Sequence, residues 1–155
     1  MQKALVEFEL GLGPDTLLAT LGRGPENGEG RATIAQYARY FGQTASKNTA
    51  APNKLSSARA AIRYHKLADS VQASDTTAAL LGSAYVMLAR DLSAEPAAAK
   101  NCDLAKELTA AATEAQVVLP RAGRSFGDIP ILFQIATELG AYGDRLTKAL
   151  CQRKD

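Results

Sequence analysis

The sequence predicts an all-α fold, a compact bundle of five to six helices with an alanine-rich core. Apolar residues recur at intervals of three and four along several segments, and breaks rich in Gly and Pro separate these segments. No segment alternates apolar and polar residues as a half-buried strand does, and no long internal repeat is visible. The 155 residues are 46% hydrophobic and 22% charged, which is typical of a single folded domain.

Residues 1–31 are expected to form an irregular N-terminal segment that contains short helices. Breaks at 11–15 and 22–30 enclose the short apolar stretch "PDTLLATL", in which Pro14 is suited to a first helical position.

Residues 32–119 are expected to form the helical core domain. Thr33 is the predicted N-cap of its first helix, and Ser74 or Asp75 that of its third. The third helix carries apolar residues on more than one face, so we expect it to lie centrally. The four predicted helices cover about residues 33–46, 54–71, 76–92 and 104–118.

Residues 120–155 are expected to form a loop and a final helix that packs on the core. Asp128 is its predicted cap, and Pro130 lies in its first turn. Gly140 and Gly143 should weaken the middle of this helix. Its apolar stripe is the cleanest in the chain, which predicts a core-facing side formed by Ile131, Ile135, Leu139, Tyr142, Leu146 and Leu150.

Two cysteines, Cys102 and Cys151, lie far apart and belong to no Cys-x-x-Cys pattern. They could form one disulfide in an oxidising compartment. Glu7 and Glu9 interrupt the apolar run that a signal peptide needs, and no stretch has the roughly 20 apolar residues of a membrane span. We therefore expect an intracellular protein whose two cysteines are separate, buried or half-buried thiols.

The charge is nearly balanced overall but unevenly distributed. Seven Lys and Arg residues lie between positions 31 and 70, against Asp69 alone, whereas acids outnumber bases before residue 31 and from 91 to 120. On a helix over 54–71, the side chains of Arg59, Arg63 and Lys66 fall within about 60° of one another. This pattern predicts a basic ridge that contacts DNA phosphates. The expected nucleic-acid-binding residues are Lys54, Arg59, Arg63, His65, Lys66, Lys47 and Arg39.

A basic helix face also has a simpler interpretation, since many such faces are only solvated. His65 and Tyr64 flank the ridge, where they could donate to a phosphate or stack on a base. A lone histidine, however, is more often a partly buried and hydrogen-bonded residue.

Three segments resemble the helical core-binding domain of tyrosine recombinases and phage integrases. They are "TIAQYARYFGQTASKNTAAPNKLSSARAAIRYHKLAD", "TTAALLGSAYVMLARDL" and "AAAKNCDLAKELTAA", and the resemblance covers about residues 33 to 115. It implies a helical clamp whose basic helix lies against duplex DNA, with the matching positions Lys54, Arg59, Arg63, His65 and Lys66.

The sequence departs from that family where catalysis would occur. Tyr142 stands where the first catalytic arginine is expected, and the 155 residues contain neither a His-x-x-Arg segment nor a C-terminal nucleophilic tyrosine. We therefore expect no strand transfer, and no enzyme of another class. A single histidine excludes most His-based metal sites, and the isolated Gly-x-Gly pairs follow no strand, so neither a cofactor nor a small-molecule substrate is predicted.

Two functions stay open at this point. The first is a non-catalytic DNA-binding module that uses the basic helix. The second is a structural or assembly subunit, either homo-oligomeric or part of a larger complex. In it, alanine-rich faces and the aromatic residues Tyr37, Tyr40 and Phe41 pack against neighbouring chains. The stretch "QYARYFGQTASK" also resembles helical coat proteins of filamentous plant viruses.

Overall fold

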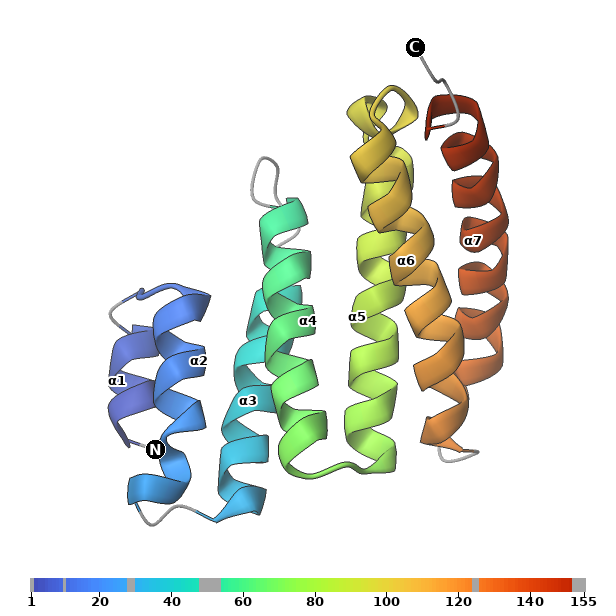
Figure 1. Cartoon of the computed structure of the whole chain (residues 1–155). Coiled ribbons are helices and arrows are strands. Elements are labelled where there is room, and N and C mark those ends of the chain that lie inside the picture. The colour runs from blue at the N-terminus through green and yellow to red at the C-terminus, as the bar shows by residue number, and fades with distance from the viewer. Residues whose placement is uncertain (1, 10, 28–29, 48–53, 124–125, 152–155) are drawn as a thin grey trace.

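The computed structural model describes residues 2–9, 11–27, 30–47, 54–123 and 126–151. Within these residues the chain forms seven α-helices and no strand, which confirms the predicted all-α bundle (Figure 1). The α-helices are α1 (Gln2–Glu9), α2 (Pro14–Gly22), α3 (Arg31–Ser46), α4 (Lys54–Val71), α5 (Asp75–Ala94), α6 (Cys102–Val118) and α7 (Ile129–Cys151). Short 3-10 turns cover Gly24–Asn27, Pro96–Ala99 and Leu119–Ala122.

Helices that follow one another in the chain lie side by side in the bundle (Figure 1). The most extensive contacts join α3 with α4, α5 with α6, and α6 with α7, while α5 also touches α7. Short connections between neighbours force each helix to run antiparallel to the one before it. As a result, α4 and α6 run in the same direction on either side of α5.

Helix starts follow the capping chemistry of the sequence in two cases and depart from it in a third. Ser74 caps α5 as predicted, since its hydroxyl accepts from the Thr77 amide at 3.1 Å and Thr77 Oγ1 accepts from the Ser74 amide at 2.8 Å. Asn101 caps α6 through Oδ1, which accepts from the Leu104 amide at 3.1 Å. The prediction of Thr33 as the cap of α3 is wrong: this helix already begins at Arg31, after Gly30.

The apolar side chains form two core clusters that meet on α4. The first surrounds Phe41 and combines residues of α1, α2, α3 and α4, and the second extends from α4 through α5 and α6 to α7. Neighbouring positions of α4 face different clusters: Ala60 and Tyr64 belong to the first, whereas Ala61 and Ile62 belong to the second. The short N-terminal helices thus share the first core cluster with α3 and α4.

The helix α7 packs on α6 through small residues, and the predicted core-facing stripe is confirmed only in part. Its buried residues are Ile129, Ala136, Gly140 and Gly143. A Cβ atom on Gly143 would lie 2.4 Å from Thr109 Oγ1, so the two helices approach too closely for a side chain there. Such a contact displaces large side chains to its flank. Ile131 is accordingly 62% exposed. The other five stripe residues are half-buried, and Ile135, Leu139 and Tyr142 among them pack against the second core cluster.

Cys102 and Cys151 form a disulfide, so the prediction of two separate thiols is wrong. Although 49 positions separate them in sequence, antiparallel packing places the start of α6 beside the end of α7, with the two Cα atoms 5.3 Å apart. The bridge therefore fastens the last helix to its neighbour at one end.

None of the helices in the described part of the chain combines the length and the apolar character that crossing a membrane requires.

Candidate functional site

A groove runs between α4 and α6, with α5 as its floor. It consists of two adjoining hollows of about 270 and 440 Å³ that share Lys66, Tyr85 and Glu114. The side chains of Tyr85 and Leu88 on α5 are nearly buried and form the apolar floor. Three cations and Asp69 line the α4 wall, while two glutamates line the α6 wall and Arg121 lies in the turn that follows it. We call this feature the α4–α6 groove; its charged lining residues are Arg59, Arg63, Lys66, Asp69, Glu107, Glu114 and Arg121.

An ion pair between Arg59 and Glu107 crosses one end of the groove. Arg59 Nε donates to one carboxylate oxygen at 2.9 Å and its Nη2 donates to the other at 2.8 Å, which is the bidentate geometry of a strong charged hydrogen bond. The hydrogen bond to Glu107 raises the pKa of Arg59 above its ordinary value. One arginine of the predicted DNA-binding ridge is therefore engaged by a carboxylate of the same chain.

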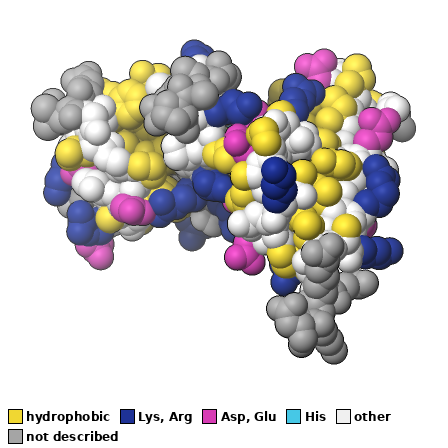
Figure 2. All heavy atoms as spheres, turned by 90° about the horizontal axis from the view of Figure 1, so that it is seen from above, with side chains coloured by type: hydrophobic (Ala, Val, Ile, Leu, Met, Phe, Trp, Pro, Cys, Tyr) yellow, Lys and Arg dark blue, Asp and Glu magenta, His cyan; other side chains and the backbone are white. Residues whose placement is uncertain are grey.

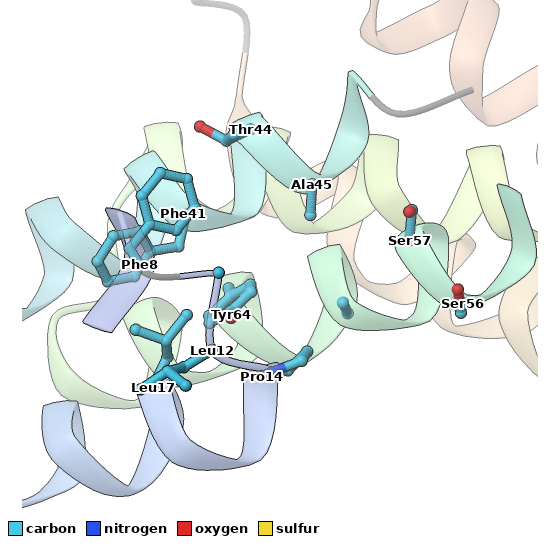
Figure 3. Close-up of a pocket in the computed structure, with 12 residues that line it drawn as sticks. Phe8, Leu12, Pro14, Leu17, Phe41, Thr44, Ala45, Ser56, Ser57 and Tyr64 are labelled. Carbon is cyan, nitrogen blue, oxygen red and sulfur yellow. The ribbon is translucent and has the colours of Figure 1, made fainter. Parts of the chain in front are cut away.

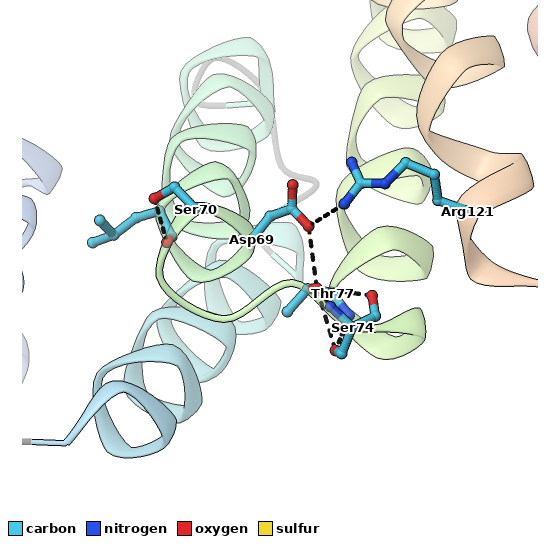
Figure 4. Close-up of polar contacts among 6 residues, drawn as sticks. Asp69, Ser70, Ser74, Thr77 and Arg121 are labelled. Carbon is cyan, nitrogen blue, oxygen red and sulfur yellow. Dashed lines mark hydrogen bonds and ion pairs between the residues drawn. The ribbon is translucent and has the colours of Figure 1, made fainter.

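A second ion pair, between Arg121 and Asp69, crosses the other end (Figure 4). Arg121 Nη2 donates to Asp69 Oδ1 at 2.7 Å, and Thr77 Oγ1 lies 3.3 Å from the same oxygen. Thr77 is buried and takes part in the N-terminal cap of α5. The carboxylate at this end is thus held between α5 and the turn that follows α6.

The middle of the groove presents two charges that no ion pair neutralises among the described residues. Lys66 is exposed on the α4 wall and Glu114 is exposed on the α6 wall. Tyr85 lies in the floor, where burial raises its hydroxyl pKa and the carboxylates of Glu114 and Asp69 raise it further. Its hydroxyl has no hydrogen bond within the described ranges. The centre therefore offers a cation, an anion and a phenol to an incoming molecule.

The predicted basic residues do not form one open ridge. Arg63 donates to Asp15 of α2 at 2.6 Å, and Lys54 lies 3.8 Å from Asp91 of α5. Arg39 is half-buried on α3 and Lys47 is exposed at its end, and neither lines the groove. Of the seven predicted residues, three line the groove side by side: Arg59, Arg63 and Lys66.

His65 is buried, which corrects its prediction as a phosphate contact. Its side chain is 1% exposed and lies over Gly42 of α3, where an added Cβ would be 2.6 Å from the imidazole. Its Nδ1 has no hydrogen-bond partner in the described part of the chain. Burial, together with the nearby positive charge of Arg39, lowers the pKa of His65 to about 4. The imidazole is therefore a neutral core group at pH 7.

Acidification from pH 7 to pH 5 is expected to lower the free energy of unfolding by about 2 kcal/mol through His65. The native pKa of about 4 lies below the ordinary 6.5, so in this range the unfolded chain binds a proton that the native state excludes. Urea unfolding of the wild type and of His65→Leu at both pH values measures the difference. Because His65 is the sole histidine in the sequence, its NMR titration gives an independent check, and a native pKa near 6.5 would contradict the expectation.

A separate hollow of about 410 Å³, outside the α4–α6 groove, lies where α2, α3 and α4 meet (Figure 3). Its lining is mainly apolar and includes Phe8, Leu12, Phe41 and Tyr64, with hydroxyl groups such as Thr44 toward one side. Burial raises the pKa of Tyr64 to about 12, so its hydroxyl stays protonated. Among the residues that the structure describes, no charged side chain lines this hollow, and they form no polar constellation like that of the groove.

Sequence reasoning missed the acidic half of the groove. Glu107 and Glu114 are seven residues apart, and so are Arg59 and Lys66, which places each pair two turns apart on one helix face. The equal seven-residue spacing of the two pairs was visible in the sequence. The parallel alignment of α4 and α6 was not visible, because that alignment depends on α5 packing between them.

Comparisons with protein-family models, with curated proteins and with solved structures found no match. The resemblance to recombinase core-binding domains therefore stays a prediction from the sequence. The function has to be inferred from the groove itself.

Proposed function

We propose that this chain is a non-catalytic protein-binding subunit that holds a segment of a partner protein in the α4–α6 groove. One observation carries the proposal: an apolar floor lies between walls of opposite net charge. Protein-binding surfaces commonly combine such a floor, often with a tyrosine, with a charged rim that fixes the orientation of the partner. This function belongs to the second class that the sequence left open.

Charge balance favours a protein segment over DNA. The described lining includes four cations, but three carboxylates accompany them. Two of these cations are paired across the groove, and Arg63 is paired with Asp15. A DNA backbone laid along the α4 wall would bring its phosphates close to Glu107 and Glu114. Like charges in such a position cost free energy, whereas release of counterions requires unpaired Lys and Arg.

The fitting occupant is a peptide segment with charges of both signs around an apolar side chain. An acidic residue of this segment would meet Lys66, and a basic residue would meet Glu114 on the opposite wall. The apolar side chain would rest on the floor at Tyr85, whose hydroxyl can hydrogen-bond to the peptide backbone.

Selection from a random-peptide display library on the folded, oxidised chain tests the proposal. Selected peptides should carry this mixed-charge pattern and should bind with dissociation constants of about 1 to 100 μM, in the range of small transient interfaces. Lys66→Glu and Glu114→Lys should each weaken binding about tenfold, since both side chains are exposed and the fold is unaffected. Lys100→Glu, an exposed residue outside the groove, is the matched control.

Duplex DNA is titrated in parallel at low and moderate salt. Little or no binding is expected. Binding that falls steeply with salt and is lost in Lys66→Glu would favour the DNA-binding function instead. Peptides that bind both groove variants with the same affinity as the wild type would also overturn the proposal.

A further inference from the structure

The apolar stripe of α7 consists of big hydrophobic side chains that the bundle leaves incompletely covered. Figure 2 shows hydrophobic side chains gathered at the end of the molecule that contains α7. Ile131 is 62% exposed, and Ile135, Leu139, Tyr142, Leu146 and Leu150 are half-buried. At about 100° per residue these six side chains occupy an arc of about 100° on one flank of the helix. The rest of the solvent side of α7 is mostly polar.

The spacing of the stripe is the same in both chain directions. From Ile131 to Leu150 the intervals are four, four, three, four and four residues, which is a palindrome. An antiparallel copy of α7 therefore matches every apolar side chain with another apolar side chain. The opposed pairs are Ile131 with Leu150, Ile135 with Leu146, and Leu139 with Tyr142, each occurring twice.

The charges beside the stripe have the same symmetry. Glu138 and Arg145 are both exposed, lie on the same edge of the stripe, and form no ion pair within the described residues. Arg145 is positioned over the Tyr142 ring, 5.9 Å from its centroid. In an antiparallel pair of helices, residues on one edge face the same edge of the partner, so Glu138 of each copy lies opposite Arg145 of the other. The axial offset of about 3 Å is within reach of these long side chains.

We propose that the occupant of this stripe is a second copy of the chain, bound as an antiparallel α7–α7 homodimer. Because such an interface is isologous, each contact forms twice about a twofold axis near the middle of α7. The α4–α6 groove does not include this stripe, so the two proposals succeed or fail separately.

Sedimentation equilibrium of the oxidised chain over a range of concentrations tests the dimer. The mass should rise toward about twice 16.3 kDa as concentration increases. Glu138→Arg and Arg145→Glu should each raise the dimer dissociation constant about tenfold or more, because each converts two attractions into two repulsions. Circular dichroism checks that these surface variants stay folded. Asp144→Arg, on the polar side of α7, is the matched control and should leave the constant unchanged.

The decisive measurement mixes the two variants. In a heterodimer of Glu138→Arg with Arg145→Glu, both charge contacts become attractive again. The arginine introduced at position 138 of one chain faces the glutamate introduced at position 145 of the other, and the unchanged Glu138 faces the unchanged Arg145. An equimolar mixture should therefore regain the wild-type affinity. A wild type that stays at 16.3 kDa at every concentration would overturn the proposal. A dissociation constant that the two charge reversals leave unchanged would overturn it as well. So would a mixture of the two variants that does not regain the wild-type affinity.

Discussion

Replacing Cys102 and Cys151 together with serine is expected to lower the free energy of unfolding by about 4 kcal/mol. The bridge closes a loop over the 49 positions from Cys102 to Cys151, and this constraint removes conformational freedom from the unfolded chain. The same bond holds the end of α7 against α6, where the packing relies on small side chains that bury little apolar area. Urea unfolding of the oxidised wild type and of the double variant measures the difference.

Reductant provides the control for this experiment. It should destabilise the wild type by a similar amount and leave the double variant unchanged, because that variant has no disulfide to reduce. A difference below about 1 kcal/mol between the two proteins would contradict the expectation, since it would mean that helix packing alone fixes α7.

Phe41→Ala is expected to lower the free energy of unfolding by about 4 kcal/mol. The Phe41 side chain is 0% exposed and occupies the centre of the first core cluster. Its ring stacks on Phe8 at 4.8 Å and lies 5.7 Å from the Tyr64 ring, so truncation leaves a cavity shared by α1, α3 and α4. Thermal and urea unfolding both measure the loss.

Tyr40→Ala is the matched control, because it removes a neighbouring aromatic ring from the same helix. Tyr40 is 49% exposed, and the expected cost is about 1 kcal/mol. Equal losses in the two variants would show that Phe41 does not anchor the cluster. The contrast also bears on the predicted role of these aromatic residues in assembly: Phe41 is buried within its own chain, whereas Tyr40 keeps an exposed face.

The helices were predictable because their signals are local. Apolar spacing of three and four and the breaks at Gly and Pro predict the ends of α3 to α7 to within a few residues. Ser74 is an N-cap residue by type and does cap α5. The prediction of Thr33 as an N-cap failed because residues of the capping type can also lie inside the first turn of a helix. The residue with extended backbone before α3 is Gly30.

The partners of each side chain were not predictable, because they depend on which helices become neighbours. The sequence offers Arg59 and Arg63 as open cations, yet Glu107 and Asp15, each 48 positions away, pair with them. In the sequence, His65 appears at the flank of a basic helix face. In the structure it is buried, because Gly42 leaves a gap in α3 that the imidazole fills. The disulfide likewise depends on α6 and α7 lying antiparallel.

The helix α4 supplies apolar side chains to both core clusters. If either cluster opens, one face of α4 loses its cover, so the free energy of the other cluster changes as well. Melting of the N-terminal helices and of the C-terminal helices is therefore expected as one cooperative transition rather than two. A molecule held against α4 from the α6 side would slow amide hydrogen exchange in α1–α3, which it does not touch.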